Sequence, residues 1–206
     1  YVVENGEYRA SMLDDDTTFG IQSSQKVGPT VADDIKTSAI WSILFALIAI
    51  ALYILIRFRN ISFSIGAVVG LVHDVLFILG IYSIFYSIMP FSLEIDQSFI
   101  AAILTVIGYS INDTVVVFDR IRENVGLYPK RALNQLINMS VNSTLSRTFS
   151  TSFSTALPLL AMFIFGGETI RGFVFAILLG VIVGTYSTIF IASPIAYDIQ
   201  EKQAKK

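Results

Sequence analysis

The sequence predicts an all-α protein that crosses a membrane several times, and its composition carries most of that prediction. Of its 206 residues, 54% are hydrophobic and 15% are charged, whereas an ordinary soluble domain has roughly 25% charged residues. The mean hydropathy is +0.68. This composition excludes a soluble globular enzyme and a disordered segment, and 14 basic against 16 acidic residues leave no basic excess for nucleic-acid binding. A polytopic membrane protein is indicated.

Five long stretches with few charges predict five transmembrane helices, because about 20 apolar residues are enough for one bilayer crossing. The first and fifth stretches contain hardly any charge, and the other three contain isolated ionisable residues. An amphipathic helix is predicted at residues 129–141, where apolar side chains share one face, and we expect it to lie along the membrane surface. The five spans cover residues 36–56, 61–89, 97–118, 143–166 and 170–194 of a bundle at 36–198.

The lysine and arginine residues of the predicted loops are divided unevenly between the two sides of the membrane. By the positive-inside rule the richer side is cytoplasmic, which places the C-terminal tail, residues 199–206, in the cytoplasm and the N-terminal segment outside it. The richer side carries Arg57, Arg59, Arg120, Arg122, Lys130, Arg131, Lys202, Lys205 and Lys206, and the poorer side carries Arg9, Lys26, Lys36 and Arg171.

The N-terminal segment, residues 1–35, is acidic and too short to bury a core of its own. We expect it to be the C-terminal remnant of a truncated extracytoplasmic domain. The chain begins at Tyr1 and shows no signal-peptide pattern, as expected for a piece of a longer protein. It contains no cysteine and a single histidine, His73, so we expect neither a metal site nor a cofactor.

Three ionisable residues inside the predicted spans are the first candidates for a functional role: Asp74, Asp113 and Arg147. Each costs roughly 2.5–3.5 kcal/mol near the bilayer centre on insertion scales, so each needs a partner or water. Asp113 and Arg147 lie at similar depth on antiparallel spans, where they can pair directly or through water. Burial and a nearby arginine act in opposite directions on the charge of a carboxyl group. The pair therefore suits proton transport, which requires no cofactor.

Further polar residues accompany these charges. His73 and Asp74 can form a proton relay or a packed polar pair. The hydroxyl groups of the fourth span either bind a neighbouring helix or line a water path to Arg147. GxxxG pairs at Gly66/Gly70 and at Gly180/Gly184 favour close helix packing. The candidate relay or packing residues are His73, Asp74, Asn112, Ser150, Thr151 and Ser154, and the last three share one face of the fourth span with Ser143, Thr144, Arg147 and Thr155.

The sequence does not favour an enzyme. It contains no H-E-x-x-H, Walker or G-x-S-x-G motif, so no catalytic residue is predicted. An aspartyl protease dyad of Asp74 and Asp113 is an alternative, although neither aspartate lies in the Gly-x-Gly-Asp context that intramembrane aspartyl proteases use.

Several motifs of the chain resemble the SecF family, which comprises SecF and the SecF halves of fused SecDF proteins in the bacterial Sec system. The resemblance extends from about Val27 to the end, and its most specific motif includes Asp113. The matching segments are VGPTV (27–31), GAVVGLVHD (66–74), VIGYSINDTVVVFDRIREN (106–124), SRT (146–148), TS (151–152) and FGG (165–167).

This resemblance implies the fold of the resistance-nodulation-division superfamily, with six spans and an extracytoplasmic α+β domain between the first two. The five predicted spans would then belong to a six-helix bundle in the bacterial inner membrane. The resemblance also implies partnership with SecD or a SecD half, and use of the proton-motive force to draw preproteins from the SecYEG channel after SecA has pushed them in. It implies proton transport by Asp113 and Arg147. Membrane lipids are expected neighbours, and nucleic acid is not.

Two other functions remain open. One is proton-coupled export of a lipid or small molecule by a member of the same superfamily. The other is a purely structural subunit of a translocon.

Overall fold

The computed structural model describes residues 2–4, 7–9 and 29–204, and the chain divides into two units, residues 1–36 and 37–206. In the first unit, strands β1 (Val2–Glu4) and β2 (Glu7–Arg9) form an antiparallel hairpin. Most of the predicted extracytoplasmic remnant, residues 1–35, lies outside the described residues.

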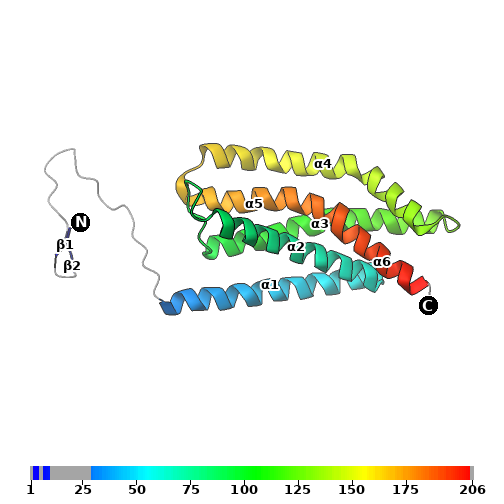
Figure 1. The fold of residues 1–206 in the computed structure, drawn as a ribbon, viewed down its shortest axis with the longest axis horizontal. Coiled ribbons are helices and arrows are strands. Elements are labelled where there is room, and N and C mark those ends of the chain that lie inside the picture. The colour runs from blue at the N-terminus through cyan, green and yellow to red at the C-terminus, as the bar shows by residue number, and fades with distance from the viewer. Residues whose placement is uncertain (1, 5–6, 10–28, 205–206) are drawn as a thin grey trace. The chain divides into compact units, whose positions relative to one another are not determined.

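The second unit is a helical membrane bundle, as predicted. Five helical segments of the described residues are long and apolar enough to cross a membrane. In Figure 1 the α1–α2 and α3–α4 connections lie at the same end of the bundle as the C-terminus, and the α2–α3 and α4–α5 connections lie at the other end. The helices are α1 (Pro29–Phe58), α2 (Ile61–Phe85), α3 (Gln97–Leu127), α4 (Leu133–Phe165) and α5 (Glu168–Ser187), which continues through a π-helical turn, η1 (Thr188–Ala192), into α6 (Ser193–Ala204).

Side-chain caps explain where two of the helices begin. Asn60 precedes α2, and its side-chain oxygen accepts a hydrogen bond from the Ser62 backbone N–H at 2.9 Å. Asp96 precedes α3 and accepts from the Phe99 N–H at 2.8 Å. Each cap satisfies one of the backbone donors that a helix start leaves free. Arg59 has φ 52°, a left-handed conformation that lets α1 reverse into α2 within two residues.

The predicted separate amphipathic helix at residues 129–141 is wrong. Residues 129–132 form a turn, and α4 begins at Leu133 and continues unbroken to Phe165. The apolar face was identified correctly, since Leu136 and Ile137 are buried. They pack against the bundle because α3 continues beyond its predicted span to Leu127 and so covers the first turns of α4. A neighbouring helix, rather than the membrane surface, therefore buries this face.

The last helix continues through Pro194, near which the fifth span was predicted to end, as far as Ala204. Proline lacks a backbone N–H and normally interrupts an α-helix. Here the π-helical turn η1 precedes it, and the N–H of Ser193 reaches back to the Thr188 carbonyl. The Ser193 hydroxyl donates to the same carbonyl at 2.8 Å. Single π turns of this kind let a helix absorb a local irregularity without ending.

Close helix packing occurs where the GxxxG pairs predicted it. A Cβ placed on Gly66 would lie 2.6 Å from the Ala192 carbonyl oxygen, and one on Gly70 would lie 3.3 Å from the Ala192 Cβ. In the same way Gly180 faces the Val106 side chain and Gly184 faces Ser110. Helix α2 therefore packs tightly on η1 and α6, and α5 packs tightly on α3, which brings their polar residues into contact.

Candidate functional site

Asp113 lies on the inner face of α3 and is nearly enclosed by the bundle. Its side chain is 4% exposed. The Ser152 hydroxyl of α4 donates to its Oδ2 at 3.5 Å, and Ser152 shares a 2.6 Å hydrogen bond with Thr185 of α5. A long hydrogen bond of this kind holds the carboxyl group weakly. Helix α3 thus presents a loosely held acidic group to α4 and α5.

Arg147 lies on α4 with an exposed side chain. Its guanidinium acts electrostatically on Asp113, but within the described part of the chain no direct ion pair joins the two. Arg147 instead borders an open cavity of about 240 Å³ between α3 and α4, together with Asp119, Arg120 and Glu123. The two residues therefore lie on adjacent helices, and within the described residues no hydrogen bond or ion pair joins their side chains.

Of the hydroxyl groups that the sequence pattern selected, Thr144 faces the interior, whereas most of the others do not. Ser150 and Ser154 are exposed, and the half-exposed Thr151 donates its hydroxyl to the Arg147 carbonyl of the previous turn. Asn112 is also exposed. The interior is lined by hydroxyl side chains at every fourth position of α4: Ser140, Thr144, Thr148 and Ser152, each less than 9% exposed.

This interior row could have been found from its strict spacing of four residues, which places successive side chains above one another on a helix. Thr148 is its least satisfied member, because its buried hydroxyl has no hydrogen-bond partner among the described residues. Buried hydroxyl groups rarely stay unpaired. Thr148 is therefore the one member of this row whose hydroxyl needs a partner from outside the described residues.

Asp74 forms a second buried carboxyl group, on α2. It is fully buried, accepts a 2.7 Å hydrogen bond from the Ser110 hydroxyl of α3, and lies 3.2 Å from Nδ1 of His73. Ser110 is one helical turn before Thr114, which donates to the Ser110 carbonyl and shares a 2.8 Å hydrogen bond with Thr188 of η1. A continuous set of hydrogen bonds thus connects α2, α3 and η1 beside Asp113.

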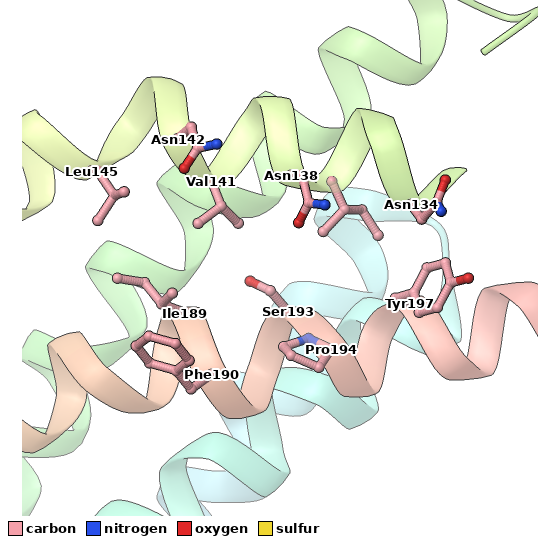
Figure 2. A pocket seen from close by; sticks show the side chains of 11 residues that line it. Asn134, Asn138, Val141, Asn142, Leu145, Ile189, Phe190, Ser193, Pro194 and Tyr197 are labelled. Carbon is pink, nitrogen blue, oxygen red and sulfur yellow. The ribbon is translucent and has the colours of Figure 1, made fainter. Parts of the chain in front are cut away.

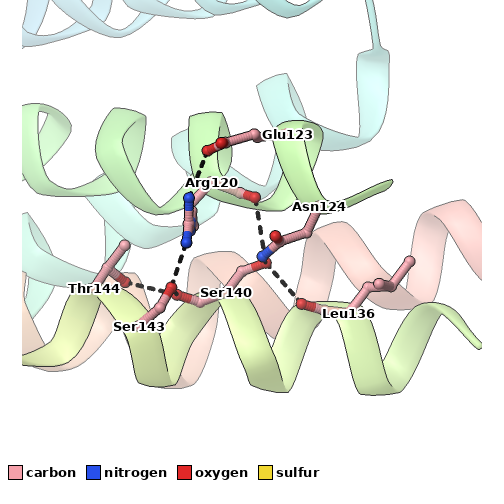
Figure 3. Close-up of polar contacts among 7 residues, drawn as sticks. All are labelled: Arg120, Glu123, Asn124, Leu136, Ser140, Ser143 and Thr144. Atoms are coloured by element: carbon pink, nitrogen blue, oxygen red, sulfur yellow. Dashed lines mark hydrogen bonds and ion pairs between the residues drawn. The ribbon is translucent and has the colours of Figure 1, made fainter. Parts of the chain in front are cut away.

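A polar cluster joins α3 and α4 at the end of the bundle where the two helices are connected (Figure 3). Arg120 donates to Glu123 at 2.7 Å and to Ser143 at 3.1 Å. The Asn124 amide, which is 3% exposed, donates to the Ser140 hydroxyl at 2.7 Å. These bonds fix the start of α4 against the end of α3, and therefore set the register in which Ser152 meets Asp113.

Comparison with known proteins places this bundle in a family. The family model described as "Protein export membrane protein SecD/SecF, C-terminal" matches residues 8–202. The chain belongs to this SecD/SecF family. A protein translocase subunit SecF from Rhodothermus marinus is 53% identical over 180 residues, which are 87% of this chain and 58% of that protein. The SecF subunit from Rhodobacter capsulatus is 47% identical over 184 residues, which are 89% and 53% of the two chains.

A solved SecDF structure has the same fold. The crystal structure of SecDF in a super-membrane-facing form matches with a TM-score of 0.74 and 38% identity, and the match covers 87% of this chain and 23% of that chain. The chain spans between half and three fifths of the length of these two SecF relatives. The five spans described above are therefore those of a SecF-type membrane bundle.

Proposed function

We propose that this chain is the transmembrane part of a Sec protein-export subunit that uses the proton-motive force, with protons carried by Asp113 and Arg147. One observation carries the proposal. Asp113 is a 4% exposed carboxyl group inside a membrane span, and Arg147, on the next helix, borders an open cavity with two further carboxylates. A buried acid close to an ionic, open cavity has the parts that a proton relay needs.

The proposed cycle has a charge change at its centre. Water in the cavity beside Asp119 and Glu123 carries protons to and from the region of Arg147. When Asp113 binds a proton, its attraction to Arg147 is lost, and the weak hydrogen bond from Ser152 allows α3 and α4 to shift relative to one another. Loss of the proton reverses the change. The helix movement drives an extracytoplasmic domain, of which residues 1–35 are the C-terminal part.

The partners and orientation belong to the same proposal. SecD or a SecD half covers the bundle beside α4, where Arg147, Ser150 and Ser154 are exposed, because polar side chains in a membrane normally face protein or water. The SecYEG channel and its preproteins are the further partners. The protein lies in the bacterial inner membrane with its C-terminus in the cytoplasm, as its lysine and arginine distribution indicates. No covalent step and no cofactor are involved.

The variant Asp113→Asn tests the proposal, because it keeps the size and polarity of the side chain and removes the exchangeable proton. We expect proton flux through the complete SecD–SecF complex in proteoliposomes to fall by about 100-fold or more, the scale on which a positioned acid or base acts. Membrane insertion and complex formation should be unchanged. The control Asp198→Asn removes an exposed carboxylate of α6 and should leave the flux intact.

The same assay separates the alternatives. Proton flux in Asp113→Asn equal to that of the unmodified complex would refute proton transport by this residue and leave a structural subunit. An exporter of the same superfamily would be favoured by a different result. In that case Asp113→Asn would abolish both proton flux and the efflux of a small molecule or lipid, and preprotein release would be unchanged.

A further inference from the structure

A groove runs along the outside of the bundle between α4 and the segment formed by α5, η1 and α6. Its first part is a cavity of about 500 Å³, lined by α4 residues from Asn134 to Leu145 on one side and by Ile189 to Tyr197 on the other. Figure 2 shows the two walls facing one another across this cavity. A second cavity of about 430 Å³ shares Ile189 and Phe190 with the first. The two cavities therefore form one groove.

The chemistry of the groove changes along its length. At the end near the α3–α4 connection, asparagines occupy every fourth position of its α4 wall: Asn134, Asn138 and Asn142. The amides of Asn138 and Asn142 are exposed and form no hydrogen bond within the described residues. The second cavity is lined mostly by apolar and aromatic side chains, among them Phe149, Phe153 and Ile182.

The length of the apolar part matches one leaflet of a bilayer. It extends along α4 from Leu145 to Ala156, which is about 16 Å of helix at 1.5 Å per residue. Half of a hydrocarbon core of about 30 Å is about 15 Å. Asn142 immediately precedes the predicted span at 143–166, so the amides lie at the depth of the polar interface.

We propose that this groove binds one glycerophospholipid molecule from the leaflet next to the α3–α4 connection. One acyl chain lies between α4 and α5, against Phe153 and Phe190, and the ester and phosphate oxygens accept hydrogen bonds from the Asn138 and Asn142 amides. These amide N–H groups are donors that no described residue occupies. In the predicted orientation this is the cytoplasmic leaflet.

A transmembrane helix of a partner protein fits the groove less well than a lipid does. Such a helix crosses the whole hydrocarbon core of about 30 Å, whereas the groove ends at Ala156, which is about halfway along the predicted span at 143–166. The change from amide to apolar lining also follows the order of groups along a phospholipid, from ester and phosphate oxygens to hydrocarbon.

Photocrosslinking tests the proposal. The complete protein, together with its SecD partner, is reconstituted in phosphatidylethanolamine and phosphatidylglycerol vesicles that contain phosphatidylcholine with a diazirine in its acyl chain. Adducts are located by mass spectrometry. We expect them to concentrate at 145–156 and 182–190, above the level at Phe45 and Ile48 of α1, which are exposed apolar residues outside the groove. The double substitution Asn138→Leu and Asn142→Leu should reduce groove adducts about five-fold, the effect of losing two modest hydrogen bonds.

Two further variants complete the test. Gln135→Leu removes an exposed amide of α4 that does not line the groove, and it should leave the adducts unchanged. Ala156→Phe fills the apolar end while both asparagines remain, and it should reduce them. Groove labelling no stronger than that of α1 would overturn the proposal. Adducts that appear only without the SecD partner would also overturn it, because that result would mean that a helix of SecD covers the groove. Equal loss of adducts in Gln135→Leu would also contradict it.

Discussion

At the scale of single residues, two buried carboxyl groups are held in different ways. Asp74 is fully buried and accepts a short hydrogen bond of 2.7 Å from Ser110, with His73 Nδ1 3.2 Å away on its other oxygen. Asp113 accepts, among the described residues, only the 3.5 Å hydrogen bond from Ser152. We therefore propose that Asp74 mainly holds α2 against α3, and that Asp113 is the group whose charge changes in the proposed cycle.

Substitution of Asp74 should destabilise the bundle. Asp74→Ala leaves the Ser110 hydroxyl buried without its acceptor, so we expect the free energy of unfolding to fall by about 2–3 kcal/mol. Asp74→Asn keeps an acceptor for Ser110 and should cost about 1 kcal/mol or less. Unfolding of the purified protein by SDS in mixed micelles measures both. Equal losses for the two variants would contradict a role based on this hydrogen bond.

Residue-level reasoning from sequence located Asp113 and Arg147 on adjacent helices but not the contacts of their side chains. Depth in the membrane follows from counting residues along a span, since the rise per residue is constant. The direction of each side chain depends on how the helices are rotated about their axes, which the packing of neighbouring residues decides. This is why Ser150 and Ser154 face outward while Ser152 faces Asp113.

At the scale of helices, glycine positions divide into those that permit close packing and those that do not. A Cβ on Gly66 would lie 2.6 Å from the Ala192 carbonyl oxygen, whereas a Cβ on Gly80 would have no atom within 4 Å. The first contact involves backbone, which cannot move without shifting η1 against α2.

Alanine substitutions at these two positions should therefore have opposite effects. Gly66→Ala should lower the free energy of unfolding by about 1–3 kcal/mol, the usual cost of overpacking. Gly80→Ala should be neutral or raise it by up to about 1 kcal/mol, because alanine favours helix over glycine. Both variants can be compared in the same SDS unfolding series. A neutral Gly66→Ala would mean that α2 and η1 are less closely packed than described.

At the scale of the whole molecule, an odd number of spans places the segment before the first span and the segment after the last span on opposite sides of the membrane. The α2–α3 connection lies at one end and the α3–α4 connection at the other (Figure 1). The sequence assigns the second of these to the cytoplasm, because lysine and arginine residues concentrate there.

Cysteine labelling tests this orientation directly, since the chain has no cysteine of its own. We expect Glu94→Cys, in the α2–α3 connection, to react with a membrane-impermeant maleimide in intact cells stripped of their outer membrane. Lys130→Cys, in the α3–α4 turn, should react only after permeabilisation. Both side chains are exposed, so access to the reagent is the one difference between them. The reverse pattern would overturn the assigned orientation.

Composition and charge spacing alone were enough to determine the class of fold, the five spans and the helices that carry Asp113 and Arg147. These properties depend on the transfer of side chains between water and hydrocarbon, which is local and nearly additive along the chain. The continuity of α4 from Leu133 and of the last helix beyond Pro194 depended on tertiary structure. Helix α4 starts early because α3 buries the apolar side chains of its first turns. The last helix passes Pro194 because the π-helical turn η1 supplies backbone hydrogen bonds just before it.

The same distinction applies to the candidate sites: some of their features follow from the sequence, and others follow only from helix packing. The ionisable residues stand out in the sequence because a charge in hydrocarbon is costly wherever it occurs. The row from Ser140 to Ser152, the Asp74–Ser110 bond and the groove beside Asn138 are decided by which helix faces which. Helix rotation and register result from many small packing contacts between distant segments, and only the tertiary structure brings those contacts together.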